Sequence, residues 1–395
     1  MSSYPIDRPV VRQEVSWFLF GLMASVTFVG ILSELVPSGI LPQMTQGLGV
    51  EETEVGFLVG VYALASAVCA IPLISLTLSV NRKTLLLALL IGFSISNIVV
   101  GFSSSYSVIV AMRIVGGICA GIMWPMIAAY GTALVPPNMH GKAITIIMSG
   151  NTLGVSLGLP LMTVIGTQIG WRTEFIVLGL AVAMIALLSA KYLPSVPGEK
   201  LTASNSPFAI LKIPSILIVL LLTFLSVTAH YGAYTYITLL VEQIEFSGGI
   251  SLALLIFGIG SIISVVLSAK VIDAYLRGLI VSMSALGLIS MLLFVVFDGT
   301  DGFSHVAFFL WGLAFGPLVT MYQTAVSKQI EHAKAVATSV QSSVFNFSIM
   351  IATWVGGLIL TQVPDTGAMG IVWLSIICFV PATIIALLTK RTLSS

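Results

Sequence analysis

The chain has 395 residues, of which 57% are hydrophobic and 8% are charged, and its formal net charge is +1. Soluble domains carry about 25% charged residues, so this composition excludes an ordinary soluble domain. The small net charge gives no basic surface for nucleic acid. Three cysteines, Cys69, Cys119 and Cys378, lie in apolar stretches without the spacing of a disulfide framework or a metal site.

Apolar runs recur along the whole chain, and each is long enough to cross a bilayer of about 30 Å. We predict twelve spans, with boundaries uncertain by about 2–4 residues. In chain order they cover residues 17–41, 55–78, 84–104, 106–130, 142–166, 173–194, 213–241, 249–272, 278–297, 303–327, 334–361 and 367–389. The sequence therefore predicts an all-α, multi-pass membrane protein that contacts membrane lipid.

The basic residues fall almost entirely on one side of this topology. Of the 16 Lys and Arg residues, only Arg113, inside a span, and Arg172, in the loop before the sixth span, lie elsewhere. Loops rich in Lys and Arg face the cytoplasm. We therefore expect both termini to be cytoplasmic.

The spans divide into two groups of six. The polar stretch at 195–212, rich in Pro, Ser and Lys, indicates a cytoplasmic linker between a bundle at 1–194 and a bundle at 213–395. A shift of 192 residues aligns seven positions without a gap. In the first half these positions are Pro125, Tyr130, Thr132, Ala133, His140, Lys142 and Ala143. They align, in the same order, with Pro317, Tyr322, Thr324, Ala325, His332, Lys334 and Ala335 in the second half. Two halves related by a pseudo-twofold axis, with a site between them, is a known transporter plan.

Glu34 and Arg113 are charged residues inside apolar runs, where a charge is costly and marks a functional site. At 1.5 Å per residue, Glu34 and His230 each lie about 25 Å from the cytoplasmic side, and Arg113 about 10 Å below the outer boundary. The three residues are thus at similar depth. If Arg113 or water moves away in one conformation, Glu34 takes up a proton, which is the basis of a proton-coupled switch. The alternatives are a static ion pair for Glu34 and Arg113, and a hydrogen-bonded helix residue for His230.

The seventh span carries an aromatic and polar stretch from Thr228 to Tyr236. Rings and hydroxyls at this depth suit a cavity for a small, partly polar molecule, and we assign Glu34, Tyr231 and Tyr234 to substrate binding in it. Tyr236 is expected in the interfacial belt. Three further intramembrane amides line the cavity or bridge helices: Asn151, Gln341 and Asn346.

The fifth span carries Gly150, Gly154 and Gly158, followed by Pro160. Small residues at every fourth position let helices approach closely, and proline can bend a helix. We predict tight packing and a hinge between the halves at these positions.

These features together resemble a known family, the major facilitator superfamily, over the whole length of the chain. The carriers of the resemblance are the twelve spans, Arg113 with Gly117, the Gly- and Pro-rich fifth span, and Gly170-Trp171-Arg172-xx-Phe175. Within the family, the chain resembles drug:proton antiporters. The stretch Glu34-Leu-Val-Pro37-Ser-Gly39, the span 7 stretch and Phe345-Asn346 resemble bacterial sugar-efflux transporters of the arabinose-efflux type.

The resemblance implies alternating access and export driven by inward proton flow, with Glu34 as the protonation site and Arg113 coupled to it. It also implies a location in the bacterial inner membrane. In the family's loop between spans 2 and 3, this chain keeps only Arg82 and Lys83. The corresponding loop after span 8 keeps the acid, Asp273. These three residues are the expected gate.

The interpretation we favour is a proton-coupled exporter of sugars, glycosides or related hydroxylated compounds. A multidrug or nucleoside and purine exporter is an alternative, as is a uniporter or importer in which Glu34 and Arg113 are structural. An enzyme is disfavoured because no catalytic cluster is recognisable. We expect no cofactor beyond the proton gradient, no metal, and a monomer whose partners are protons, lipid and a small-molecule substrate.

Overall fold

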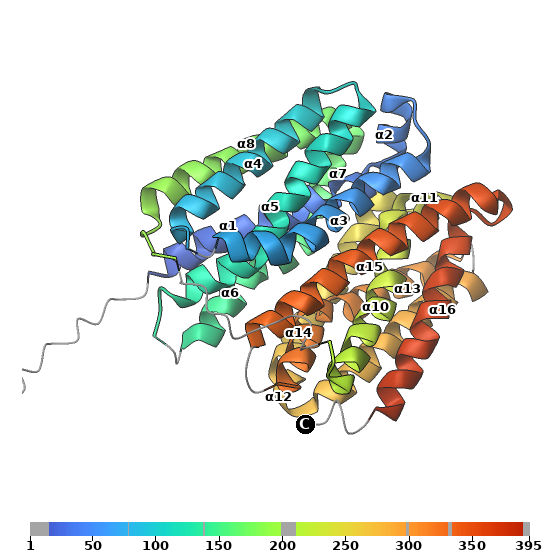
Figure 1. The fold of residues 1–395 in the computed structure, drawn as a ribbon. Helices are drawn as coiled ribbons and strands as arrows, with labels where there is room; N and C mark the ends of the chain where they lie inside the picture. The colour runs from blue at the N-terminus through green and yellow to red at the C-terminus, as the bar shows by residue number, and fades with distance from the viewer. Residues whose placement is uncertain are drawn as a thin grey trace, which may run out of the picture.

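The computed structural model describes residues 16–77, 79–136, 139–198, 211–297, 300–330 and 334–389. Within its helices, the side chains at 70, 71, 74, 75, 140–142, 273, 301 and 334–336 are outside the description. All the regular structure in the described part of the chain is helical (Figure 1). Within these residues, twelve helical segments are long and apolar enough to cross a membrane, which confirms the predicted number of spans.

The first half contains six spans. Its elements are α1 (Trp17–Gly39), α2 (Leu41–Leu48), α3 (Glu52–Thr77), α4 (Arg82–Phe102), α5 (Tyr106–Thr132), α6 (His140–Leu153), a π-helical turn η2 (Gly154–Gly158), α7 (Leu159–Gln168) and α8 (Trp171–Tyr192). The fifth span thus consists of α6, η2 and α7. Proline has no N–H to donate four residues back, so Pro160 interrupts the regular ladder, and the π turn lies directly before it.

The second half also contains six spans. Its elements are α10 (Pro214–Thr235), α11 (Ile237–Gln243), α12 (Gly249–Val296), α13 (Asp301–Phe315), α14 (Leu318–Lys328), α15 (Lys334–Gln362), η3 (Pro364–Thr366) and α16 (Gly367–Leu388). Spans 8 and 9 form one helix, α12, which is kinked at Tyr275 (φ −130°, ψ 34°). The predicted tenth span is divided at Gly316-Pro317, whereas its equivalent, α5, continues through Pro125.

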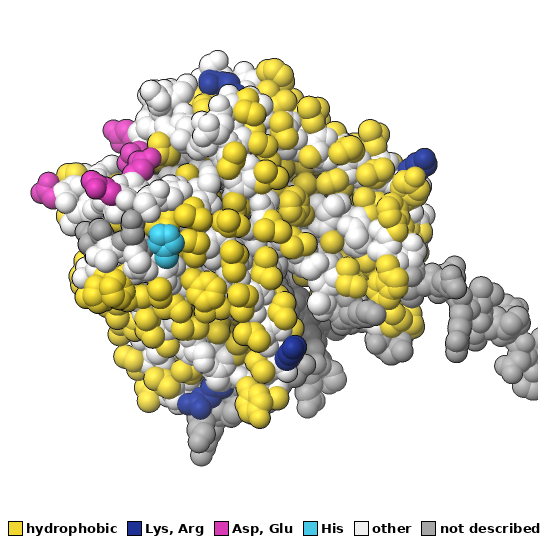
Figure 2. All heavy atoms as spheres, turned by 180° about the vertical axis from the view of Figure 1, so that it is seen from behind, with side chains coloured by type: hydrophobic (Ala, Val, Ile, Leu, Met, Phe, Trp, Pro, Cys, Tyr) yellow, Lys and Arg dark blue, Asp and Glu magenta, His cyan; other side chains and the backbone are white. Residues whose placement is uncertain are grey.

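Two ends of the bundle can be distinguished. We call the end where α1 begins and α16 finishes the termini end, and the other the opposite end. Acidic residues gather at the opposite end, at Glu51, Glu54, Glu242, Glu245 and Asp365. Figure 2 shows acidic side chains gathered toward one end of a face that is otherwise largely apolar, as a lipid-facing surface requires.

At the termini end, the loop before α4 is tied to the linker. Asn81 caps α4 by accepting hydrogen bonds from the backbone N–H groups of Lys83 (3.0 Å) and Thr84 (3.3 Å). Its Nδ2 donates to Ser195 Oγ at 2.7 Å. Arg82 is buried and Lys83 is half-buried, but the side chain of Asp273, the third expected gate residue, lies outside the described residues.

The halves meet at two helix crossings that are equivalent under the pseudo-twofold. Spans 2 and 11 cross where Gly60 of α3 faces Thr353 of α15. Spans 8 and 5 cross where Gly258 of α12 faces Ser156 of η2. A Cβ atom on Gly258 would lie 2.6 Å from the Ser156 Cα, so only glycine permits this approach.

Tyr236 corrects one expectation. It is 1% exposed, and its hydroxyl donates to the Thr353 carbonyl at 2.9 Å, so its assignment to an interfacial belt is wrong. Gly56 of α3 and Gly356 of α15 lie against its ring and leave room for it. Tyr236 instead belongs to the contact between the halves toward the opposite end.

Candidate functional site

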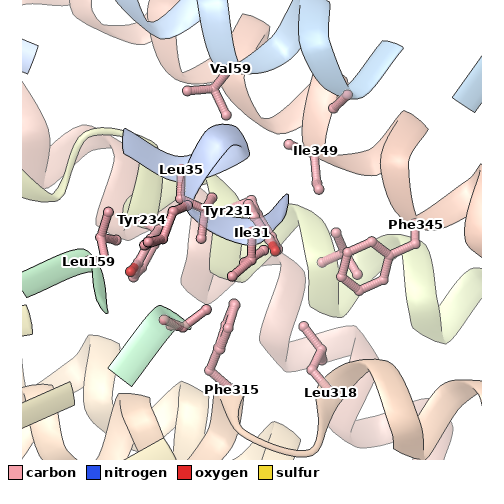
Figure 3. Close-up of a cluster of buried hydrophobic side chains, with 14 of the residues drawn as sticks. Ile31, Leu35, Val59, Leu159, Tyr231, Tyr234, Phe315, Leu318, Phe345 and Ile349 are labelled. Atoms are coloured by element: carbon pink, nitrogen blue, oxygen red, sulfur yellow. The ribbon is translucent and has the colours of Figure 1, made fainter. Parts of the chain in front are cut away.

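A cluster of buried side chains from both halves lies at the centre of the bundle (Figure 3). We call it the central cluster. It comprises Ile31, Leu35, Val59 and Leu159 from the first half, with Tyr231, Tyr234, Phe315, Leu318, Phe345 and Ile349 from the second. Glu34 and Arg113 lie next to this cluster.

Arg113 binds backbone rather than carboxylate. Its guanidinium donates to the carbonyls of Ser33 and Glu34 (the latter at 2.7 Å) on α1, and its Nε donates to the Leu58 carbonyl on α3 at 2.9 Å. Pro37 explains the first of these bonds. Because it has no N–H, the Ser33 carbonyl lacks its intrahelical donor, and Arg113 supplies one instead.

Close packing of α5 on α3 holds Arg113 in place. The guanidinium carbon lies 4.3 Å from the centre of the Tyr62 ring, a cation–π contact. Gly117 and Gly121, one and two turns further along α5, face the backbone of Tyr62 and Ser66. A Cβ atom at Gly121 would lie 2.6 Å from the Ser66 carbonyl oxygen, so larger residues would force α5 away from α3.

The Glu34 carboxylate is buried, with 4% of the residue exposed. It is close enough to Arg113, Tyr62 and Tyr231 to interact with them electrostatically. Among the described residues, however, no ion pair or hydrogen bond engages this carboxylate. The predicted proximity of Glu34 and Arg113 is present, and the acid is left without a fixed partner.

His230 lies apart from this pair. It is 1% exposed, and its Nδ1 accepts a hydrogen bond from Trp311 Nε1 at 2.9 Å. Its ring packs edge-on against Phe315 and Phe379, with centroids 5.4 and 4.9 Å away. These contacts lie within the second half and match the expected alternative of a hydrogen-bonded helix histidine.

Tyr231 and Tyr234 form the aromatic part of the central cluster, as Figure 3 shows. The Tyr231 ring lies 5.6 Å from Phe315 and 5.8 Å from Phe345, while Tyr234 stacks on Phe315 at 5.7 Å. The Tyr234 hydroxyl is buried and has no hydrogen-bond partner among the described residues. An apolar, ring-lined site with a few free polar groups is typical of small-molecule binding.

The three predicted amides occupy different surroundings. Gln341 on α15 is fully buried, and neither its Nε2 nor its Oε1 has a partner in the described part of the chain. Asn346, also on α15, donates to the Ser342 carbonyl at 2.9 Å, and Asn151 on α6 is half-buried. Gln341 is thus the one of the three that is fully buried with neither amide atom hydrogen-bonded in the described residues.

The glycines of the fifth span face α1. Gly150 lies against Ala24 and Thr27, while Gly154 and Gly158 lie against Phe28 and its neighbours. The predicted tight packing is therefore within the first half, and the contact with the second half comes from Ser156 on another face of the same span. The predicted hinge role of these glycines and of Pro160 stays a prediction.

Two partners of Arg113, Pro37 and Tyr62, were not predicted from the sequence. Pro37 is part of the stretch from Glu34 to Gly39. Its effect on the Ser33 carbonyl can be recognised only when the side chain that lies against this carbonyl is known. Tyr62 lies in an apolar run with no local signal. Glu174, near the start of the predicted sixth span at 173–194, is also absent from the predicted site residues.

Twelve apolar helices arranged as two halves around a buried acid, arginine and aromatic cluster define a multi-pass membrane transporter. A family model described as Major Facilitator Superfamily matches residues 23–353. The chain belongs to this superfamily, and in bacteria such a protein lies in the inner membrane. Its members are transporters, not enzymes.

A curated relative and several solved structures are similar to the chain. The "Probable sugar efflux transporter" of Mannheimia succiniciproducens is 28% identical over 380 residues, covering 93% of this chain and 95% of the relative. A bacterial homologue of the human lysosomal transporter Spinster, solved inward-facing and unoccupied, has a TM-score of 0.70 at 16% identity and covers 97% of this chain and 98% of its own. The human organic anion transporter MFSD10 (TETRAN) has a TM-score of 0.66 at 17% identity, covering 96% and 100%. These structures support the fold.

Proposed function

We propose that the protein is a proton-coupled antiporter that exports a small hydroxylated solute, of the sugar or glycoside class, by alternating access. The observation that carries this proposal is the Glu34 carboxylate, which is buried at the junction of the halves without a fixed partner. A charge in such a position is costly and is typical of proton and substrate pathways.

The geometry supports a division of roles between Glu34 and Arg113. Arg113 is held by carbonyls of α1 and α3, so its position does not depend on the charge of Glu34. Glu34 can bind or release a proton without breaking an Arg113 hydrogen bond. Protonation removes a negative charge near Tyr231, and in this way it can bias the contact between α1 and α10.

The substrate class follows from the side chains of the central cluster and its surroundings. Tyr231, Tyr234 and Phe315 supply ring faces, and the Tyr234 hydroxyl and the Gln341 amide have unused donors and acceptors. Sugar rings present apolar faces and many hydroxyls, which such a site complements. The sugar-efflux relative supports the same class.

The proposed transport cycle involves the two bundles as separate bodies. The bundles at 1–194 and 213–395 move relative to each other and are joined by the linker at 195–212, with both termini in the cytoplasm. Arg82, Lys83 and Asp273 take part in the gate at the termini end, and the working unit is a monomer.

The test uses purified protein in liposomes, with a panel of radiolabelled sugars and glycosides added outside. With an imposed proton gradient, we expect wild-type protein to accumulate substrate against its gradient. Glu34→Gln should abolish accumulation but retain exchange of labelled for unlabelled substrate at equal pH. Glu245→Gln, at an exposed acid of the opposite end, is the matched control and should behave as wild type.

Undiminished proton-driven accumulation by Glu34→Gln would refute the proton-binding role. Transport that ignores the proton gradient in the wild type would instead favour the uniporter alternative. For the substrate site, Tyr234→Phe should weaken sugar binding by about 2- to 10-fold, the value of one neutral hydrogen bond. Unchanged affinity would exclude that hydroxyl from the site.

A further inference from the structure

A second carboxyl, Glu174, is buried at the opposite end of the first half. It lies in the first turn of α8 and is 0% exposed. Both of its carboxyl oxygens are buried and have no hydrogen-bond partner among the described residues. Glu34, by comparison, lies beside an arginine.

Two helices, α7 and the end of α1, pack against this carboxyl. A Cβ atom on Gly166 of α7 would lie 3.1 Å from the Glu174 carboxyl carbon and 2.5 Å from the Ile40 Cγ2 atom. The Glu174 carboxyl therefore fills the space between α7 and the end of α1. Thr163, one turn before Gly166 on the same face of α7, lies against Gly39. Its hydroxyl is likewise buried and without a partner in the described part of the chain.

Charged groups on the surrounding helices do not neutralise Glu174. On α8 itself, Arg172 stacks over the Trp171 ring at 4.2 Å. The basic residues of α4, Arg82 and Lys83, are at the termini end, and α2 and α7 contain no titratable residue. On α1 the titratable group is Glu34, about 7.5 Å along the helix from Gly39 at 1.5 Å per residue.

An isolated ionised carboxylate in such a place costs far more free energy than folding can supply, and buried groups of this kind take up a proton instead. We propose that Glu174 is a second proton-binding site, occupied while the opposite end is closed and independent of Glu34. The inference rests on the proposed proton-coupled function only for its role in transport, because proton occupancy is measurable without substrate.

The position of Glu174 links its proton to opening. The helices that bury it, α1 and α7, also contact α11 and α12 of the second half. Separation of the halves at this end therefore moves the walls of the Glu174 site. Entry of water stabilises the ionised form, so opening releases the proton and proton loss favours opening.

Infrared difference spectroscopy of the purified full-length protein tests the occupancy. We expect a carbonyl band of a protonated carboxyl that is lost in Glu174→Gln and kept in Glu34→Gln. Thr163→Val, which keeps the acid and removes only a neighbouring hydroxyl without a partner in the described residues, should keep this band. A spectrum unchanged in Glu174→Gln would overturn the assignment. Loss of the band on adding sodium at constant pH would indicate a cation site and would also overturn it.

Distance measurements test the coupling. Spin labels at Gln46→Cys on α2 and Glu245→Cys beyond α11 report the opening of the opposite end, in a background without the native cysteines. Raising the pH should increase the open fraction several-fold in the wild type and in Glu34→Gln, but not in Glu174→Gln. Glu242 is a competing group, because partial burial and then Glu52 raise its pKa. Glu242→Gln is therefore the control and should keep the response. A response lost in Glu242→Gln and kept in Glu174→Gln would refute the coupling.

Discussion

The hydrogen bond from Arg113 to the Ser33 carbonyl gives a quantitative prediction. Pro37 deprives this carbonyl of its intrahelical donor, so Arg113 is its donor in the described structure. The carbonyls of Glu34 and Leu58, which Arg113 also contacts, lie in helices where residues 38 and 62 can donate to them. Replacing Arg113 should therefore strand one buried carbonyl, not three.

The perturbation is Arg113→Met, made alone and together with Pro37→Ala. Stranding a buried acceptor costs about 1–3 kcal/mol. Pro37→Ala restores an N–H at position 37 that can bond to the Ser33 carbonyl. Arg113→Met should therefore destabilise the protein by about 1–3 kcal/mol less in the Pro37→Ala background than in the wild type. The lost charge and the lost Tyr62 contact are common to both backgrounds and cancel.

The assay is the free energy of unfolding in mixed micelles titrated with denaturing detergent, measured for the four proteins of the cycle. Pro72→Ala is the matched control, because Pro72 is also inside a helix, α3, but is exposed on its surface. The cost of Arg113→Met should be the same with or without Pro72→Ala. A coupling energy near zero for Pro37, or an equal one for Pro72, would refute the account that Arg113 supplies the donor that Pro37 removes.

Two further predictions concern packing and capping. Gly258→Ala should reduce the fraction of protein closed at the opposite end, because its Cβ would strike the Ser156 backbone. The closed fraction is measured with the spin-label pair at Gln46 and Glu245. Gly278→Ala, where nothing lies within 4 Å, is the control and should have no effect; equal effects of the two variants would contradict the crossing. Asn81→Ala should lower the free energy of unfolding by about 0.5–2 kcal/mol, because α4 loses its N-cap. Ser105→Ala, at the N-cap of α5, removes no side-chain capping hydrogen bond and should leave the free energy of unfolding unchanged. Equal losses in the two variants would contradict the capping role of Asn81.

Several features of the molecule were predictable because they depend on local composition. Twelve spans follow from apolar runs of bilayer length, and the family follows from motifs such as Glu34 to Gly39 and Arg113 with Gly117. The similar depth of Glu34 and Arg113 follows from the constant rise of a helix. None of these depends on how a helix is rotated about its axis.

The tertiary structure decided what each of these residues touches. The amphipathic signal is weak when both lipid and protein interior are apolar, so the sequence could not show that Tyr236 is buried, that His230 bonds to Trp311, or that Glu174 faces α7. Arg113 binds carbonyls rather than the Glu34 carboxylate because a proline on another helix left one of them without a donor. Such a choice depends on three helices packed together, and therefore only the fold determines it.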